Sequence, residues 1–234
     1  MKVRAIMNDR YERNIGAITE AEQELLKTKR AAIAGCGGLG CYAAEFLARL
    51  GLGHLTLIDG DVFAESNLNR QLYSLEVNLG KSKTAEAKKR LQQIRADISL
   101  ETVEAFINEE NAEGLLKGHD VIIDALDNVK TRLLLEKAAD RLGIPLVHGA
   151  VEQWGAQVCT VFPGDFTLSV LYHTDGEFKR PSVPSFMPAF CASIEAAEAV
   201  KVLLNRKGIL RKKLLFANLA ENSFEIVELN HNSS

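Results

Sequence analysis

The chain has 234 residues, of which 47% are hydrophobic and 25% charged, and its net charge at pH 7 is −3. These values are typical of a globular protein that buries a core without disulfide or metal support, and they disfavour general electrostatic binding of nucleic acid. The N-terminal residues lack the apolar core of a signal peptide and no apolar run is long enough to span a membrane, so we expect a cytoplasmic protein.

The first part of the chain alternates short apolar runs with helix-like patterns. Strands are predicted at 29–35, 54–61, 99–105, 119–128 and 144–151. Helices are predicted at 39–51, which ends at a glycine, at 82–94, where Ser82 can cap the N-terminus, and at 130–143. This alternation predicts an α/β, Rossmann-like, doubly wound fold with a mainly parallel sheet.

After Gly149 the pattern changes to a C-terminal antiparallel extension. Residues 155–165 and 166–172 are expected to form paired strands around a Pro-Gly turn, followed by a helix at 189–205 and strands at 212–219 and 223–229. A proline-rich crossover loop is expected near 173–188. We expect one domain over 1–234, with an N-terminal helical arm at 1–28, a nucleotide-binding core at 29–150 and a C-terminal part at 151–234.

A glycine-rich loop connects the first predicted strand to the first helix. Gly35 can form the tight turn, Gly37 and Gly38 let a phosphate approach the backbone, and Gly40 lets helix and strand pack closely. The helix N-terminus offers free N–H groups to an anion. Asp59 ends the second strand, where a carboxylate can bind ribose hydroxyls. The loop predicts a nucleotide site but does not separate ATP from NAD.

Further polar residues follow the second and fourth strands, at the sheet edge where ligands bind in open α/β folds. They are Asp61, Asn67, Arg70, Gln71, Lys81, Lys83, Asp124, Asp127 and Asn128. Cations and amides suit a triphosphate, and the acids on the fourth strand suit Mg²⁺. No tyrosine has a lysine four residues on, which disfavours an NAD-dependent oxidoreductase and leaves it as an alternative.

Five short motifs together resemble the ThiF/MoeB/HesA adenylyltransferases, relatives of the ubiquitin-activating E1 enzymes. They are "RYERN", "GCGGLG", "DGD…SNLNRQ", "GKSK" and "DALDN". The resemblance covers residues 10–229 and implies an enzyme that uses ATP and Mg²⁺. Its expected substrate is the C-terminal carboxylate of a small ubiquitin-like sulfur-carrier protein of ThiS/MoaD type with a Gly-Gly terminus, which becomes an acyl-adenylate as pyrophosphate is released.

The resemblance also assigns roles to residues. Arg70, Lys83, Asp127 and Arg13 are the expected catalytic residues. Of these, Asp127 would hold the metal, and Arg13 would extend into a neighbouring subunit's site, which implies a homodimer. The expected ATP-binding set is completed by Gly35, Gly37, Gly38, Gly40, Asp59, Asp61, Asn67, Gln71 and Asn128. Alternatives are a solvated Lys83 with Lys81 in its place, a Gln71 that only orients Arg70, an Asp127–Asn128 pair that only caps a helix, and an Arg13 that is an ordinary surface residue.

The chain departs from many family members in its cysteines. Cys36, Cys41, Cys159 and Cys191 form no CxxC pair, so no structural zinc is expected. Cys191 is read as a small buried hydrophobe, and an enzyme thioester is not expected. The loop at 173–188 is expected to border a channel for the acceptor tail. A small-molecule carboxylate or a modified tRNA base remains an alternative substrate, and neither membrane nor nucleic-acid partners are expected.

Overall fold

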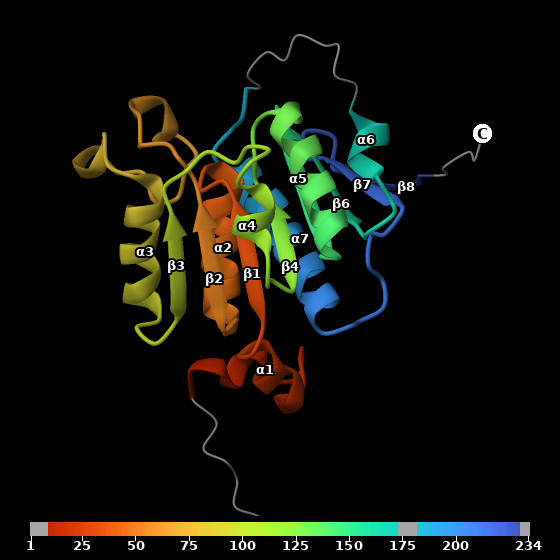
Figure 1. The fold of residues 1–234 in the computed structure, drawn as a ribbon, viewed down its shortest axis with the longest axis horizontal. Coiled ribbons are helices and arrows are strands. Elements are labelled where there is room, and N and C mark those ends of the chain that lie inside the picture. Colours follow the sequence, from red (N-terminus) through yellow and green to blue (C-terminus); the bar gives the residue numbers. More distant parts are fainter. Residues whose placement is uncertain (1–8, 173–181, 230–234) are drawn as a thin grey trace, which may run out of the picture.

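The computed structural model describes residues 9–172 and 182–229. Its centre is one eight-stranded sheet in the order β3-β2-β1-β4-β5-β6-β7-β8 (Figure 1). The strands are β1 Arg30–Ala34, β2 His54–Ile58, β3 Ser99–Val103, β4 Val121–Asp124, β5 Leu146–Glu152, β6 Gly155–Val161, β7 Lys213–Asn218 and β8 Ser223–Glu228. Pairing from β3 to β5 is parallel and pairing from β5 to β8 is antiparallel. The predicted fold class is therefore confirmed.

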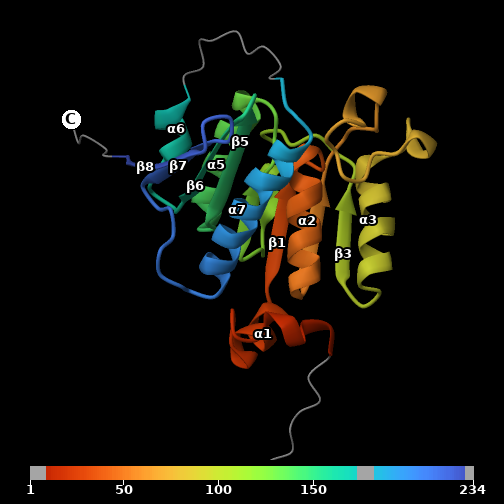
Figure 2. The same ribbon diagram turned by 180° about the vertical axis from the view of Figure 1, so that it is seen from behind.

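Helices cover both faces of the sheet. One layer contains α2 (Gly38–Leu50), α3 (Lys83–Ile94) and α7 (Phe186–Leu203), which face the viewer in Figure 2. The other contains α4 (Ala112–Leu116), α5 (Val129–Leu142) and α6 (Thr167–Leu171). The short elements are η1 (Asp9–Asn14), α1 (Glu20–Leu26), η2 (Glu65–Asn67) and η3 (Glu76–Asn78). No helix among the described residues is long and apolar enough to cross a membrane.

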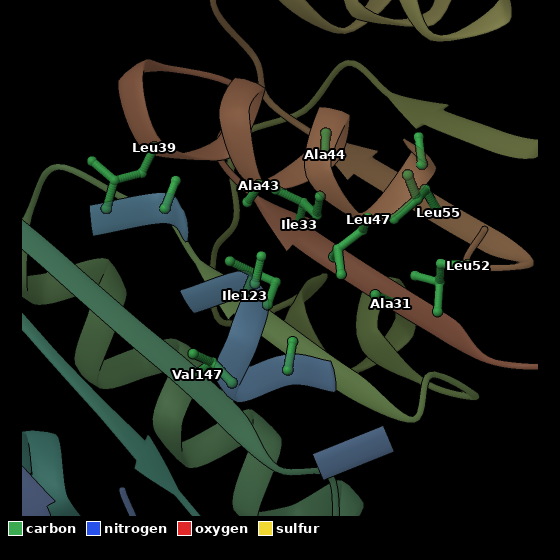
Figure 3. Packing of buried hydrophobic residues seen from close by; sticks show 14 of the residues in the cluster. Ala31, Ile33, Leu39, Ala43, Ala44, Leu47, Leu52, Leu55, Ile123 and Val147 are labelled. Carbon is green, nitrogen blue, oxygen red and sulfur yellow. The ribbon is translucent and has the colours of Figure 1, made fainter. Parts of the chain in front are cut away.

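The core lies on both sides of the central strands. Ala31 and Ile33 of β1 pack toward α2, where Figure 3 shows them beside Ala43 and Leu47. The alternate residues of β1 belong to the cluster on the opposite face, beneath α5. Successive side chains of a strand point to opposite faces, so a strand covered on both sides must be apolar throughout. This is why "AAIA" contains no polar residue.

Helix boundaries follow from their capping residues, largely as predicted. The amide of Ala85 donates to Ser82 Oγ at 3.3 Å, which caps α3. Gly51 (φ 98°) and Gly143 (φ 70°) end α2 and α5 in the left-handed conformation that glycine adopts without steric cost. These caps fix where each helix meets the loops at the sheet edge.

One predicted strand is wrong, because residues 167–171 form helix α6 instead of pairing with β6. The carboxylate of Glu136, from α5, accepts from the amides of Leu168 and Ser169 at 2.6 and 3.0 Å. A carboxylate that binds free N–H groups stabilises a helix N-terminus. β6 pairs instead with β5 and β7. The apolar run does not reveal this, because its capping acid lies about thirty residues earlier in the sequence.

The predicted crossover loop is only partly described. Residues 173–181 lie outside the described part of the chain. Phe186 and Pro188, assigned to the loop, belong to the first turn of α7, which begins three residues before the predicted helix. Proline is compatible with a first helical turn because its missing N–H would have no partner there.

Candidate nucleotide site

The strand order reverses between β1 and β4, since the connection after β1 enters α2 on one face and that after β4 enters α5 on the other. The two strands are paired in parallel, with Ala34 opposite Asp124 at their carboxyl ends. In doubly wound sheets such a reversal opens a crevice at the carboxyl ends of the strands, where ligands bind. The glycine loop enters this edge directly from β1.

Two glycines of the loop have the turn and packing roles that the sequence predicts. Gly35 has φ 98°, and a β-carbon built on it would lie 2.6 Å from the carbonyl oxygen of Ala125. A β-carbon on Gly40 would lie 1.8 Å from the carbonyl oxygen of Gly35. No side chain fits at either position without moving backbone. The loop therefore keeps α2 close to β1 and β4.

The N-terminus of α2 is open to an anion. Its N-cap residue, Gly37, supplies no side-chain hydrogen bond, so no capping side chain occupies the first N–H groups of this thirteen-residue helix. Pro188 of α7 lies 3.2 Å from a β-carbon built on Gly38, so this glycine is covered on one side. Free amides and a positive dipole end form an anion site of the kind that binds phosphate.

Gln71 lies against the glycine loop. Its Nε2 is 3.5 Å from a β-carbon built on Gly37, and its side chain is 7% exposed. Its buried Oε1 has no hydrogen-bond partner among the described residues. The side chain of Gln71 therefore lies beside Gly37 of the loop, and its role, in binding ATP or in orienting Arg70, stays a prediction.

Asp59 connects the end of β2 to the glycine loop. Its Oδ2 accepts from the amide of Cys36 at 2.6 Å, and its Oδ1 accepts from the amide of Asp61 at 2.8 Å. Burial raises the pKa of the carboxyl above its ordinary value, and the nearby Lys83 ammonium opposes this shift. Both oxygens keep a further lone pair, which suits acceptance from ribose hydroxyls.

Lys83 is buried, which excludes the solvated alternative. Its side chain lies in the first turn of α3, the residue is 6% exposed, and its Nζ donates to Asp61 Oδ2 at 2.9 Å. The Lys83 amide also donates to the carbonyl of Asp61 at 3.1 Å. Lys81, the competing lysine, is exposed. A buried ammonium held beside Asp61 and within the field of Asp59 is a preorganised cation at this sheet edge.

The turn after β2 carries Arg70 and Asn67. The side chain of Asn67 accepts from the amide of Ala64 at 2.9 Å, so it shapes the η2 turn. Arg70 Nη1 donates to the carbonyl of Ser66 at 2.8 Å and to Asn69 Oδ1 at 2.9 Å. Arg70 forms no ion pair with any residue that the structure describes. Its charge is thus held in place by neutral acceptors and remains uncompensated.

The two acids after Ile123 have different environments. Asp127 is exposed beyond β4, and its neighbour Asn128 caps α5 by accepting from the amide of Thr131 at 2.9 Å. Asp124, which the sequence groups with Asp127 as a magnesium ligand, is fully buried, and its Oδ2 lies 2.7 Å from His148 Nδ1. Asp124 is therefore not available to a metal, and that part of the prediction is wrong.

A magnesium ion bound here would rely on few protein ligands. Within residues 9–172 and 182–229 no three acids, histidines or cysteines cluster closely enough to hold a metal alone. Mg²⁺ bound with a nucleotide commonly uses one or two carboxylates and completes its shell with phosphate oxygens and water. The exposed carboxylate of Asp127 fits that type of site.

Arg13 lies far from the other predicted site residues. It is exposed and belongs to η1, whose last residue, Asn14, donates from its side-chain amide to the carbonyl of Leu50 at 3.3 Å, at the C-terminal end of α2. That end of α2 is at the amino edge of the sheet, and Figure 1 shows α1 and its neighbouring turn below the strands. Within one chain, Arg13 does not join Arg70 and Lys83.

The structure also contains polar residues that the sequence did not single out. His148, Arg132 and Tyr172 form a hydrogen-bonded cluster around Asp124, and Glu195 of α7 is fully buried nearby. A histidine within the apolar run "PLVHGAV" was the one available signal. The four cysteines are all buried, and burial raises the pKa of the Cys191 thiol well above its ordinary value.

Comparisons with known proteins agree with this geometry. Residues 11–234 match the ThiF family. The SAMP-activating enzyme E1 of Haloferax volcanii is 34% identical over 227 residues, covering 94% of this chain and 84% of that protein. The sulfur carrier protein adenylyltransferase of Thermus thermophilus is 33% identical over 243 residues, covering 96% and 88%.

The fold also matches the solved structure of a protein with ATP. The crystal structure of E. coli MccB with ATP has a TM-score of 0.85 over 98% of this chain and 73% of that chain. Its sequence identity of 22% shows a shared fold and no more. The family match over nearly the whole chain and the 34% identical relative decide the assignment: the chain belongs to the ThiF family.

Proposed function

We propose that this chain is an ATP-dependent adenylyltransferase that activates the C-terminal carboxylate of a small ubiquitin-like sulfur-carrier protein. The observation that carries the proposal is the open N-terminus of α2 facing the same sheet edge as the buried Lys83–Asp61 pair. Relatives named as adenylyltransferases and as acting on a sulfur carrier protein support the reaction and the substrate class. They favour it over an oxidoreductase, a small-molecule carboxylate or a tRNA base.

In the proposed reaction a carboxylate oxygen of the carrier attacks the α-phosphorus of ATP. A bond forms between that oxygen and phosphorus, and the bond to the β-phosphate oxygen breaks, so pyrophosphate leaves and an acyl-adenylate remains. The attacking carboxylate is already ionised at neutral pH, so no general base is needed. The protein contributes by orienting the reactants and by stabilising negative charge on the phosphoryl oxygens.

Each part of the site has a role in that scheme. The N–H groups at Gly37 and Gly38 bind phosphate oxygens, and Asp59 accepts from the ribose hydroxyls. Arg70 and Lys83 stabilise charge on the triphosphate, with Gly35, Gly40, Asn67, Gln71, Asp61 and Asn128 shaping the surrounding turns. Asp127 would hold Mg²⁺, which neutralises charge on the phosphate oxygens and on the leaving pyrophosphate when bound.

Pyrophosphate exchange tests the assignment. Purified protein with Mg-ATP and a Gly-Gly-tailed carrier is expected to return labelled pyrophosphate into ATP. Lys83→Ala should lower the rate about 100-fold or more, since it removes a fixed cation from the charge-bearing oxygens. Lys81→Ala, the same change at an exposed lysine two residues earlier, should stay within about twofold. Pyrophosphate exchange that persists in Lys83→Ala would contradict the site. An absence of exchange with every Gly-Gly-tailed carrier tested would contradict the substrate class.

The active form is proposed to be a homodimer in which Arg13, at the opposite sheet edge from Lys83 in its own chain, would extend into the neighbouring subunit's site. Arg13→Ala and Lys83→Ala proteins are each expected to be inactive. After mixing and refolding together, mixed dimers contain one intact site, so about a quarter of all sites should recover. Absence of recovery in a verified mixed dimer would show that Arg13 acts elsewhere.

We also propose that the continuous sheet makes the whole described chain one domain.

A further inference from the structure

The hydroxyl of Tyr172 lies at the centre of the buried polar cluster. Arg132 Nη1 is 3.1 Å from it, His148 Nε2 is 2.9 Å from it, and the amide nitrogen of Gln157 also contacts it. Tyr172 is the C-cap residue of α6, whereas the three neighbours come from α5, β5 and β6. One phenol oxygen therefore joins four elements of the fold.

The neighbours of this hydroxyl fix the direction of its hydrogen bonds. Arg132 and the amide nitrogen of Gln157 only donate, so they use the acceptor positions of the oxygen. The single hydroxyl proton is left for His148 Nε2. His148 then carries its own proton on Nδ1 and donates it to Asp124 Oδ2 at 2.7 Å. Burial lowers the pKa of His148, which agrees with a neutral ring having this tautomer.

The far end of this chain of hydrogen bonds holds the peptide groups of Leu126. Its amide donates to Asp124 Oδ1 at 3.1 Å. Its carbonyl accepts from Arg132 Nε at 3.1 Å and Nη2 at 2.6 Å. Both polar groups of the residue before Asp127 are thus bound by side chains that also contact the Tyr172–His148 pair. The side-chain carboxylate of Asp127 is left exposed in a fixed loop.

The Tyr172 end is anchored as well. Glu136 binds the first amides of α6 at 2.6 and 3.0 Å and the hydroxyl of Ser169 at 2.6 Å. It is 2% exposed and belongs to α5, the helix that also carries Arg132. The Tyr172 phenol is therefore also fixed by its own helix, α6, and does not simply move with residues 125–128.

We propose that Tyr172 and His148 are positioning residues that fix the Ala125–Asn128 loop, and with it the Asp127 carboxylate, through Asp124 and Arg132. This inference rests on the proposed function only for the use of Asp127, since the hydrogen bonds that fix the loop are features of the fold. Groups that orient a metal ligand tune metal affinity although they do not touch the metal.

The fold-level part is tested without any activity measurement. In ¹⁵N-histidine-labelled wild-type protein, His148 is expected to show a protonated Nδ1 and a bare Nε2, with its signals assigned by their loss in His148→Gln. In Tyr172→Phe, amide exchange of a peptide spanning 125–131 should rise about tenfold, because Leu126 loses its support. Tyr73→Phe is the matched control: that buried hydroxyl has no hydrogen-bond partner among the described residues, so exchange should not change.

The functional part is measured through the dependence of pyrophosphate exchange on Mg²⁺ concentration. Tyr172→Phe should raise the Mg²⁺ concentration for half-maximal rate about tenfold, with most of kcat restored at saturation. A purely structural role would lower kcat without moving that concentration. A His148 protonated on Nε2, or unchanged amide hydrogen exchange at 125–131, would overturn the proposal. If the wild type did not catalyse pyrophosphate exchange, only the proposed function would be contradicted. The His148 tautomer and the amide hydrogen exchange would still test the positioning role.

Discussion

Glu195 is buried without a partner, and this gives its replacement a predictable effect on stability. The residue is 0% exposed, and neither carboxylate oxygen has a hydrogen-bond partner among the described residues. A β-carbon built on Gly149 would lie 2.4 Å from its Cδ, so the carboxyl lies directly over β5. Burial raises the pKa of Glu195 well above its ordinary value, Asp124 adds to the shift, and Arg132 opposes it.

The sign of the pH dependence follows from proton binding. Above about pH 4.3 the unfolded chain has released this proton, whereas the folded protein keeps it up to its raised pKa. Within that window the free energy of unfolding falls by about 1.4 kcal/mol per pH unit because of Glu195 alone. Glu195→Gln replaces the protonated carboxyl with a neutral group of the same shape, so it removes this dependence. The change of about 1.4 kcal/mol per pH unit corresponds to a shift in Tm of about 3–6 °C for a chain of this size.

Urea unfolding of wild type and Glu195→Gln across pH 5 to 7 measures the difference and cancels the other titrating groups. The two proteins should be similarly stable near pH 4.3, and above it the variant should gain up to about 1.4 kcal/mol per pH unit on the wild type until the folded wild type itself releases the proton. Unfolding curves whose separation does not change with pH would refute the reasoning, since they would mean that Glu195 titrates alike in both states.

Glu45→Gln is the control of opposite sign. Burial alone would raise the pKa of Glu45, but hydrogen bonds from Arg90 and Arg49 outweigh it and lower the pKa. The stability contributed by this group is present above its unfolded pKa and is lost as pH falls through the folded value. The variant should therefore be less stable than wild type near neutral pH, with the difference shrinking on acidification.

Two further predictions concern backbone contact and thiol access. Gly40→Ala should lower the free energy of unfolding by about 3 kcal/mol or more, because its β-carbon would meet the Gly35 carbonyl. Gly114 is helical and has no atom near a built β-carbon, so Gly114→Ala should raise the free energy of unfolding by about 0.5–1 kcal/mol. Urea unfolding measures both changes. Equal effects of the two changes would contradict the packing role of Gly40. All four buried cysteines should resist iodoacetamide near pH 7 and react in urea, since burial raises the pKa of thiols such as Cys191; rapid native alkylation would contradict this.

Much of the fold could be predicted because its signals are local. Apolar alternation, glycine stops and capping residues placed β1 to β5, α2, α3 and α5 within a few residues. The glycine loop indicated a nucleotide, and the turn that contains Arg70 distinguished an adenylyltransferase-like pattern from a dinucleotide site. The one predicted strand that became a helix, α6, depends on Glu136, a partner about thirty residues away that no local pattern reveals.

The sequence by itself determined which residues follow which strand, and therefore that Asp59, Arg70, Lys83 and Asp127 lie toward one sheet edge. Only the tertiary structure decided their environments. It buries Lys83 against Asp61, hydrogen-bonds Asp124 to His148, and places Arg13 at the opposite edge of the sheet. The physical reason is that burial, pairing and charge depend on neighbours distant in sequence, whereas strand and helix periodicity depend on residues close by.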